Sequence, residues 1–362
     1  MNIKYLKLGE IATYINGYAF KPEDWDNKGR PIIRIQNLTN SSNEINYFSR
    51  DIDEKYIVNK GDILISWSAS IGIYEWTKEE AVLNQHIFKV VFNKVDINKK
   101  YYKFIVDLCL KSAIKYMHGS TMKHITKKYF DDIVVPIPNL EVQEKIAKIL
   151  GKAQELMEKR KIQIECLDEL VKSQFVEMFG DPVTNPMNWK KKRLADECNI
   201  ITGNTPSRKI EAYYGDYIEW IKSDNITNSS TYLTTAREYL SKEGLKVGRS
   251  INKNSILMTC IAGSIKCIGN VAIADRKVAF NQQINGIEPL NNNVYFMFQQ
   301  FNLSQTYIQS TINMSLKGIL SKGQLSELEF IFPPIELQNQ FAEFVKAIDK
   351  LKVALQNSYK IM

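Results

Sequence analysis

The segment Pro138-Asn-Leu-Glu141-Val-Gln143-Glu-Lys-Ile146 reappears, with substitutions, as Pro333-Pro-Ile-Glu336-Leu-Gln338-Asn-Gln-Phe341. The two copies are 195 positions apart (333 minus 138). A repeat of this length indicates two copies of one structural unit, and it therefore has to be considered before any local pattern. In both copies a proline precedes residues with helical periodicity. The sequence predicts two similar globular units, each followed by a long helix.

Four further matches occur in the same order in both halves. They are Asn37-Leu-Thr-Asn-Ser-Ser42 with Asn225-Ile-Thr-Asn-Ser-Ser230, Asn59-Lys-Gly-Asp-Ile-Leu64 with Asn252-Lys-Asn-Ser-Ile-Leu257, Asn84-Gln85 with Asn281-Gln282, and Met122-Lys123-His-Ile125 with Leu316-Lys317-Gly-Ile319. Small insertions in surface loops explain why the shift varies between these matches. The duplication could serve the structure alone. We favour one scaffold that carries two specificities, because the matching frame is kept while the residues between the matches differ.

The helices after the two units carry apolar residues at alternating spacings of four and three, which is the pattern of a coiled-coil seam. The seam residues are Val142, Ile146, Ile149 and Leu156 in the first helix, and Leu337, Phe341, Phe344, Ile348 and Leu351 in the second. A whole domain separates the helices and can return the chain, so we expect an antiparallel coiled coil. The alternative is that each helix packs only on its own domain.

The remaining sequence alternates strand-like runs with helical ones, so we predict an α+β fold in which each unit is a curved sheet with a few helices. Expected strands include 31–35, 62–66, 217–221 and 256–259, and expected helices include 101–116 and 294–312. The predicted boundaries are 1–140 for the first domain, 141–180 for the central helix, 181–335 for the second domain and 336–362 for the C-terminal helix.

Composition sets broad limits on function. The chain has 362 residues, a net charge of +8 and an apolar fraction of 44%, which is typical of a folded protein that can bind a polyanion. No apolar run approaches the roughly 20 residues of a membrane helix, so we expect no membrane association. The five cysteines form no CxxC pair and favour a reducing cytoplasm.

Motifs for catalysis are missing from the sequence. We find no GxxxxGK[ST] phosphate loop and no Asp/Asn-Pro-Pro-Tyr/Phe motif, which marks amino-methyltransferases. The three histidines lie apart, without the spacing of metal ligands. We therefore expect no catalytic residue and no metal site in this chain.

Several of the segments above resemble those of a known protein family. Leu8-Gly-Glu-Ile11 with Gly17, and Leu194 with Gly203, resemble the opening of a target recognition domain. Gly61-Asp-Ile-Leu-Ile-Ser66, the two Asn-Gln pairs and the bridge Val176-Glu-Met-Phe-Gly-Asp-Pro182 fit the same family. Along its whole length the chain resembles the specificity subunit of a type I restriction-modification system. Its final helix is shorter than the family pattern.

The resemblance implies a specificity subunit without catalytic activity. Each domain would read one half of a split target in double-stranded DNA, and the coiled coil would fix the gap between the halves. The implied partners are two methyltransferase subunits, which use S-adenosylmethionine to methylate adenine N6, and, where restriction is present, two motor-nuclease subunits that use ATP and Mg²⁺. This chain would bind no cofactor.

Reading bases requires donors and acceptors on loops, such as Arg or Lys for guanine and Asn or Gln for adenine. The candidate DNA-binding residues are Arg34, Gln36, Asn37, Ser68, Ser70, Gln85, Lys123 and His124 in the first domain, and Ser207, Arg208, Lys222, Ser223, Asp224, Ser264, Lys266, Gln282 and Lys317 in the second. Lys123 and Lys317 occupy matching positions, so we expect them to contact phosphates.

Three other functions remain open from the sequence. The first is the specificity subunit of an orphan methyltransferase or of another phage-defence complex without restriction. The second is a coiled-coil scaffold that binds protein, which would keep its affinity at high salt. The third is a stand-alone nuclease, which metal-dependent cleavage by the pure chain would reveal.

Overall fold

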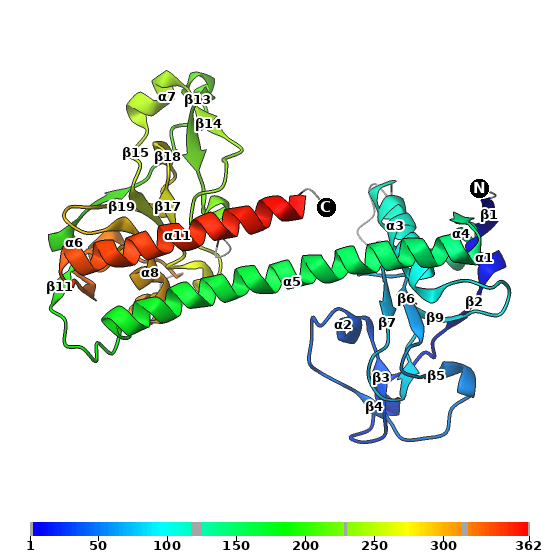
Figure 1. Cartoon of the computed structure of the whole chain (residues 1–362). Coiled ribbons are helices and arrows are strands. Elements are labelled where there is room, and N and C mark those ends of the chain that lie inside the picture. Colours follow the sequence, from blue (N-terminus) through cyan, green and yellow to red (C-terminus); the bar gives the residue numbers. More distant parts are fainter. Residues whose placement is uncertain (1–2, 117–124, 228–229, 313–317, 361–362) are drawn as a thin grey trace. The chain divides into compact units, whose positions relative to one another are not determined.

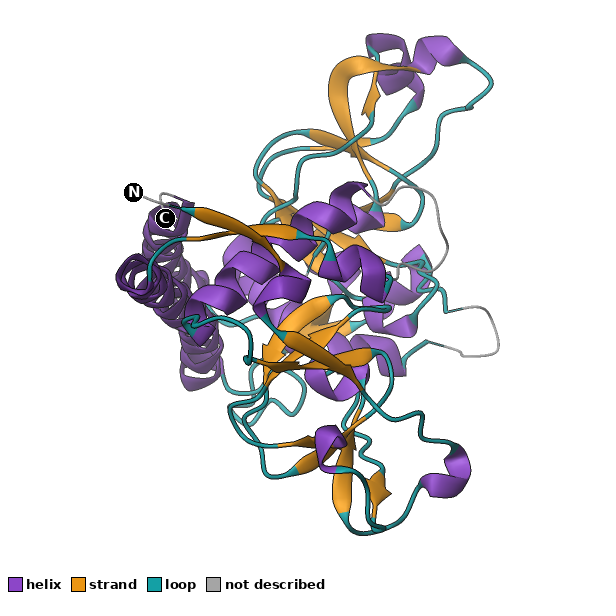
Figure 2. Ribbon diagram, turned by 90° about the vertical axis from the view of Figure 1, so that its right-hand side faces the viewer, coloured by secondary structure: helices purple, strands orange, loops and turns teal. Residues whose placement is uncertain are grey.

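The computed structural model of the chain describes residues 3–116, 125–227, 230–312 and 318–360. It divides into two compact units, Met1–Glu158 and Lys159–Met362. Each unit combines helices and strands (Figures 1 and 2), which confirms the predicted α+β class with two similar domains. The strands of each unit are divided among three small sheets.

The first unit contains two four-stranded sheets and one strand pair. Their orders are β2(Thr13–Asn16)-β9(Ile87–Val91)-β6(Ile63–Ser66)-β7(Gly72–Glu75), β4(Tyr47–Phe48)-β3(Arg30–Ile33)-β8(Ala81–Leu83)-β5(Ile57–Val58), and β1(Lys4–Lys7)-β10(Val134–Ile137). Successive side chains of a strand point to opposite faces. In β6, accordingly, Ile63 and Ile65 pack in one apolar cluster and Leu64 packs in another. This strand therefore joins the two halves of the domain core.

The second unit repeats this topology. Its sheets have the orders β12(Cys198–Thr202)-β19(Ile284–Pro289)-β16(Ser255–Thr259)-β17(Val271–Ala274), β14(Tyr239–Leu240)-β13(Tyr214–Ile221)-β18(Val278–Phe280)-β15(Ser250–Ile251), and β11(Lys191–Arg193)-β20(Glu329–Ile331). Even the parallel pair β3–β8 has its counterpart in the parallel pair β13–β18. The correspondence extends to strand order and strand direction, which is what a duplicated domain requires.

Short helices lie between the strands of both units. Those of the first unit are α1(Leu8–Ile11), α2(Ile35–Leu38), α3(Lys99–Tyr116) and α4(Lys127–Asp131); those of the second are α6(Leu194–Glu197), α7(Lys242–Val247), α8(Val294–Leu303), α9(Gln305–Ser310) and α10(Lys322–Glu327). Single 3-10 turns are η1(Pro22–Asp24), η2(Glu54–Tyr56), η3(Glu211–Tyr213), η4(Ser223–Asn225) and η5(Ile265–Cys267). The segment 294–312, which the sequence predicts to be helical, forms two helices, because Ser304 ends α8 and a new helix starts at Gln305.

The two long helices are α5(Leu140–Phe179) and α11(Ile335–Lys360). Near its start, α5 places Ala147 in the core of the first unit. Within the second unit the last turns of α5 lie beside α11 (Figure 1): the ring of Phe341 is centred 5.8 Å from that of Phe179, and Lys352 Nζ lies 2.5 Å from Asp168 Oδ1. Residue numbers rise along α11 as they fall along α5, so the two helices are antiparallel here.

Burial differs along the predicted seam. Phe341 and Ile348 are buried, and Val142, Ile146, Leu337 and Phe344 are partly buried. Leu156 is 36% exposed, Leu351 54% and Ile149 67%. The apolar contacts of the seam are thus concentrated at the start of α11, where Phe341 meets the aromatic end of α5.

A buried glutamine connects each long helix to its domain. Gln143 donates from Nε2 to the carbonyl of Pro138 (2.8 Å) and accepts from the N–H of Asn98 (2.9 Å). Gln338 does the same with Pro333 (2.8 Å) and Asn293 (2.9 Å). The side chains of Asn98 and Asn293 cap α3 and α8 by accepting from Tyr101 and Tyr295. The repeated glutamine therefore links the start of each long helix to the start of a helix in its domain: α5 to α3 in the first unit, and α11 to α8 in the second.

Candidate nucleic-acid interface

In the first domain a loop-to-loop contact is built around Gly17. A Cβ atom at Gly17 would lie 2.0 Å from the carbonyl oxygen of Asn84, so the backbones approach more closely than any side chain allows. The N–H of Gln85 donates to the carbonyl of Tyr18 (2.8 Å). The Asn-Gln pair of the sequence is thus fixed against the loop that follows β2.

The loop after β6 joins the same contact. The N–H of Trp67 donates to His86 O (3.2 Å), and the N–H of Ile125 donates to Trp67 O (2.8 Å). The candidate residues Ser68 and Ser70 stand on this loop. Lys123 and His124 lie outside the described residues, directly before Ile125.

The second domain repeats the arrangement. A Cβ atom at Gly203 would lie 2.1 Å from Asn281 O, the N–H of Cys260 donates to Gln283 O (2.8 Å), and the N–H of Leu320 donates to Cys260 O (2.9 Å). The loop after β16, which carries the exposed candidates Ser264 and Lys266, occupies the place of the Trp67 loop. The candidate Lys317 lies outside the described residues. We call the two loop sets the paired loop clusters.

Arg34 and Lys222 begin equivalent turns beside these clusters. The side-chain oxygen of Asn37 accepts from the N–H of Arg34, and that of Asn225 accepts from the N–H of Lys222, both at 3.0 Å. The amide of Asn37 donates to the carbonyl of Glu44 (2.8 Å), and that of Asn225 donates to Thr235 (3.1 Å). The side chains of Asn37 and Asn225 therefore hold their loops in place.

The other candidates on these turns differ in exposure. Gln36 and Ser223 are half-buried, and Asp224 is exposed. Ser207 and Gln282 are also exposed, and the Thr205 hydroxyl bonds to Gln282 Oε1. The structure thus brings the loop of Ser207 and Arg208 to the Asn-Gln loop.

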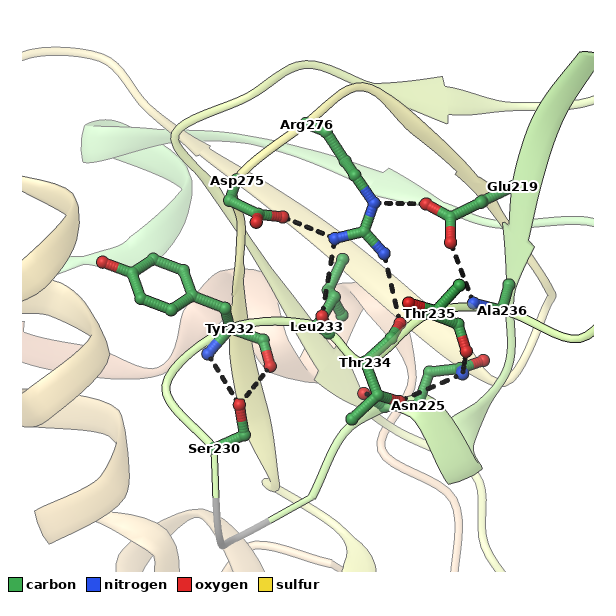
Figure 3. Close-up of polar contacts among 10 residues, drawn as sticks. All are labelled: Glu219, Asn225, Ser230, Tyr232, Leu233, Thr234, Thr235, Ala236, Asp275 and Arg276. Atoms are coloured by element: carbon green, nitrogen blue, oxygen red, sulfur yellow. Dashed lines mark hydrogen bonds and ion pairs between the residues drawn. The ribbon is translucent and has the colours of Figure 1, made fainter. Parts of the chain in front are cut away.

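An ion pair holds the loop that follows Asn225, as Figure 3 shows. Arg276 Nε donates to the carboxylate of Glu219, and its other nitrogens donate to the carbonyls of Leu233 (3.4 Å) and Thr234 (3.2 Å). The bond from Arg276 lowers the pKa of the Glu219 carboxyl below its ordinary value, although partial burial opposes this. The loop is therefore tied to β13 and to the turn between β17 and β18.

Glu238 is a residue that the sequence analysis missed. Its carboxylate accepts from Arg208 Nη2 (2.5 Å) and from Lys222 Nζ, two of the predicted DNA-binding cations. The bond from Lys222 and that from Arg208 lower the pKa of Glu238. The guanidinium of Arg208 also lies 4.5 Å from the ring centre of Tyr214 and 5.1 Å from that of Trp220. These five residues form what we call the Glu238 cluster.

One protein-family model matches the chain twice, and this double match identifies the family. A family model described as the type I restriction modification DNA specificity domain matches residues 2–166 and again residues 186–361. The two matches coincide with the two copies of the repeat and leave few residues uncovered. The chain belongs to this family. It is a specificity subunit of the type I restriction-modification class.

Curated relatives carry the same description over most of their length. The type I restriction enzyme EcoBI specificity subunit of Escherichia coli is 25% identical over 374 aligned residues, which cover 96% of this chain and 78% of the relative. The MjaVIII specificity subunit of Methanocaldococcus jannaschii is 24% identical, with coverages of 84% and 76%.

Solved structures share the fold. The S subunit of the type I system from M. genitalium superposes with a TM-score of 0.59 at 14% identity, covering 99% of this chain and 92% of that one. A chain from a structure of the assembly and conformational transition of a type I system gives a TM-score of 0.57, also at 14% identity. None of the helices in the described parts of the chain has the length and apolar character that a membrane span requires.

Proposed function

We propose that this specificity subunit reads a split target in double-stranded DNA, one half with each domain, and that it is not itself catalytic. The observation that carries the proposal is the pair of loop clusters. The same close approach of a glycine to an Asn-Gln loop is built twice, at Gly17 and at Gly203, while the side chains around it differ. A repeated frame with different surroundings suits two readers of different half-sites.

The chemistry of the clusters supports base and backbone contacts. Gln85 and Gln282 can form paired hydrogen bonds with adenine, and the serines of the loops can contact either bases or phosphates. The net charge of +8 favours a polyanion. We propose phosphate contacts for Lys123 and Lys317, which flank the described parts of the clusters.

The partners follow from the family. We propose that two methyltransferase subunits use S-adenosylmethionine to methylate adenine N6, a reaction that requires the base to be flipped out of the duplex. In a restricting complex, two motor-nuclease subunits would add ATP- and Mg²⁺-dependent cleavage in the cytoplasm. The role of this chain is to hold DNA in register for those subunits, with α5 setting the gap between the half-sites.

Single-molecule sequencing of genomic DNA tests this function. Cells that express the chain with its neighbouring methyltransferase are compared with cells that lack the chain. We expect N6-methyladenine at a split motif only when the chain is present. The variants Gln85→Ala and Gln282→Ala should each relax the motif in one half, and in different halves. Methylation of an undivided motif, or none while the methyltransferase is active, contradicts the proposal.

A further inference from the structure

The Glu238 cluster has a counterpart in the first domain with a different charge. Arg34 corresponds to Lys222 in the repeat, and its Nη1 donates to the Oδ1 of Asn46 (3.0 Å). Asn46 stands directly before β4, as Glu238 stands directly before β14. The two domains therefore place a carboxamide and a carboxylate against equivalent cations.

Backbone hydrogen bonds establish that equivalence independently of side chains. The N–H of Ile32 donates to Asn46 O (2.8 Å), and the N–H of Trp220 donates to Glu238 O (3.0 Å). Each cation also lies over an aromatic ring: Arg34 is 5.4 Å from the ring centre of Trp25, and Lys222 is 5.2 Å from that of Trp220. The position before β4 and β14 is thus one structural site that faces a DNA-binding cation in both domains.

We propose that this site tunes the specificity of each domain, with Glu238 as a positioning residue that restrains Arg208 and Lys222 from indiscriminate contact with DNA phosphates. The inference rests on the proposed function. A phosphate that recruits either cation has to replace the carboxylate already bound to it, so backbone contact alone gains little. Binding then depends more on base contacts, which carry sequence information.

The geometry fits this role. The side chains of Arg208 and Lys222 are 55% and 33% exposed, so both can be reached by a ligand, and that of Glu238 is 34% exposed. The ring of Trp220 lies against both cations, and that of Tyr214 lies against Arg208. Trp220 Nε1 also donates to Asn204 O (3.3 Å) in the loop of Arg208. In the first domain the neutral Asn46 orients Arg34 and leaves its full charge for DNA.

Binding of the full-length chain to a random-sequence duplex tests the proposal, measured between about 50 and 200 mM salt. We expect Glu238→Gln to bind this duplex about three- to ten-fold more tightly, and its salt dependence to steepen by about 0.9 per additional phosphate contact. The reciprocal change Asn46→Asp should weaken the binding and reduce the slope. Damage to the fold would weaken binding in both variants, so the opposite signs separate restraint from damage.

Glu243→Gln is the matched control. It removes one carboxylate from α7 of the same domain, where Glu243 pairs with Lys246 at 2.6 Å and touches neither Arg208 nor Lys222. We expect its affinity for the random duplex to rise less than that of Glu238→Gln. Equal affinities and slopes for Glu238→Gln and Glu243→Gln overturn the inference. If the parent chain binds no duplex at any salt concentration, the proposed function itself fails.

Discussion

At the scale of single residues, the paired loop clusters depend on two glycines. The contacts of 2.0 and 2.1 Å that a Cβ atom would make at Gly17 and Gly203 are with backbone atoms, which cannot turn away as a side chain can. These positions therefore need glycine for space. Neither of them has a positive φ angle.

We predict that Gly17→Ala and Gly203→Ala each lower the free energy of unfolding by about 1–3 kcal/mol, through overpacking against Asn84 and Asn281. Gly151→Ala in α5 is the control, because a Cβ there meets nothing within 4 Å. It should stabilise the helix by about 0.5–1 kcal/mol. Thermal unfolding of the three variants measures this, and equal effects at all three positions would contradict the argument.

The Glu219–Arg276 ion pair predicts a pH dependence. The folded pKa of Glu219 is lowered, so the pair contributes stability that is present above the ordinary pKa of 4.5 and is lost as the pH falls through the lower folded pKa. Glu219→Gln should lower the free energy of unfolding at pH 7 by about 1–3 kcal/mol. Its stability should fall less than that of the parent between pH 7 and acidic pH.

Urea unfolding at neutral and acidic pH measures both quantities. Glu243→Gln, which removes an exposed carboxylate of the same unit, should retain the acid sensitivity of the parent chain. A Glu219→Gln variant with the full acid sensitivity of the parent would show that this carboxylate is not the titrating group.

At the scale of elements, the sequence predicts the two domains and the two long helices better than it predicts the role of each residue. The repeat identifies Gln143 and Gln338, and the 4-3 spacing identifies both long helices. Periodicity does not reveal that Asn225 is buried and bonded to its own loop, because its partner, the carbonyl of Thr235, is brought close only by the fold of the chain. Glu238 has no local signal either, because its partners are 30 and 16 positions away in the chain.

The buried glutamines allow a test of how the helices are held. We predict that Gln338→Leu lowers the free energy of unfolding by about 1–3 kcal/mol, because the N–H of Asn293 loses its acceptor. Gln340→Leu on the same helix should change it by less than about 0.5 kcal/mol, since Gln340 is exposed. Chemical unfolding of the two variants gives the comparison. Similar losses of stability in the two variants would mean that the effect comes from replacing a glutamine of α11 by leucine and not from the lost hydrogen bond.

At the scale of the whole molecule, α5 is one helix that belongs to both units, with residues 140–158 in the first and 159–179 in the second. Its antiparallel contacts with α11 involve its later part, at Asp168 and Phe179. Its earlier part can therefore be lengthened without shifting those contacts. This separation makes the proposed role of α5 in setting the gap between half-sites accessible to experiment.

Duplicating residues 152–158 in place would add seven helical residues, or about 10.5 Å of helix. Since successive base pairs are about 3.4 Å apart, we predict that the gap between the two methylated half-sites grows by about three base pairs. The half-sites themselves should not change, because both loop clusters are untouched. Methylome sequencing reads both properties at once. The control keeps the parental helix length and replaces the exposed residues Lys152, Gln154 and Glu158 with alanine. It should keep the parental gap. A parental gap in the lengthened chain, with methylation retained, would mean that α5 does not set the spacing.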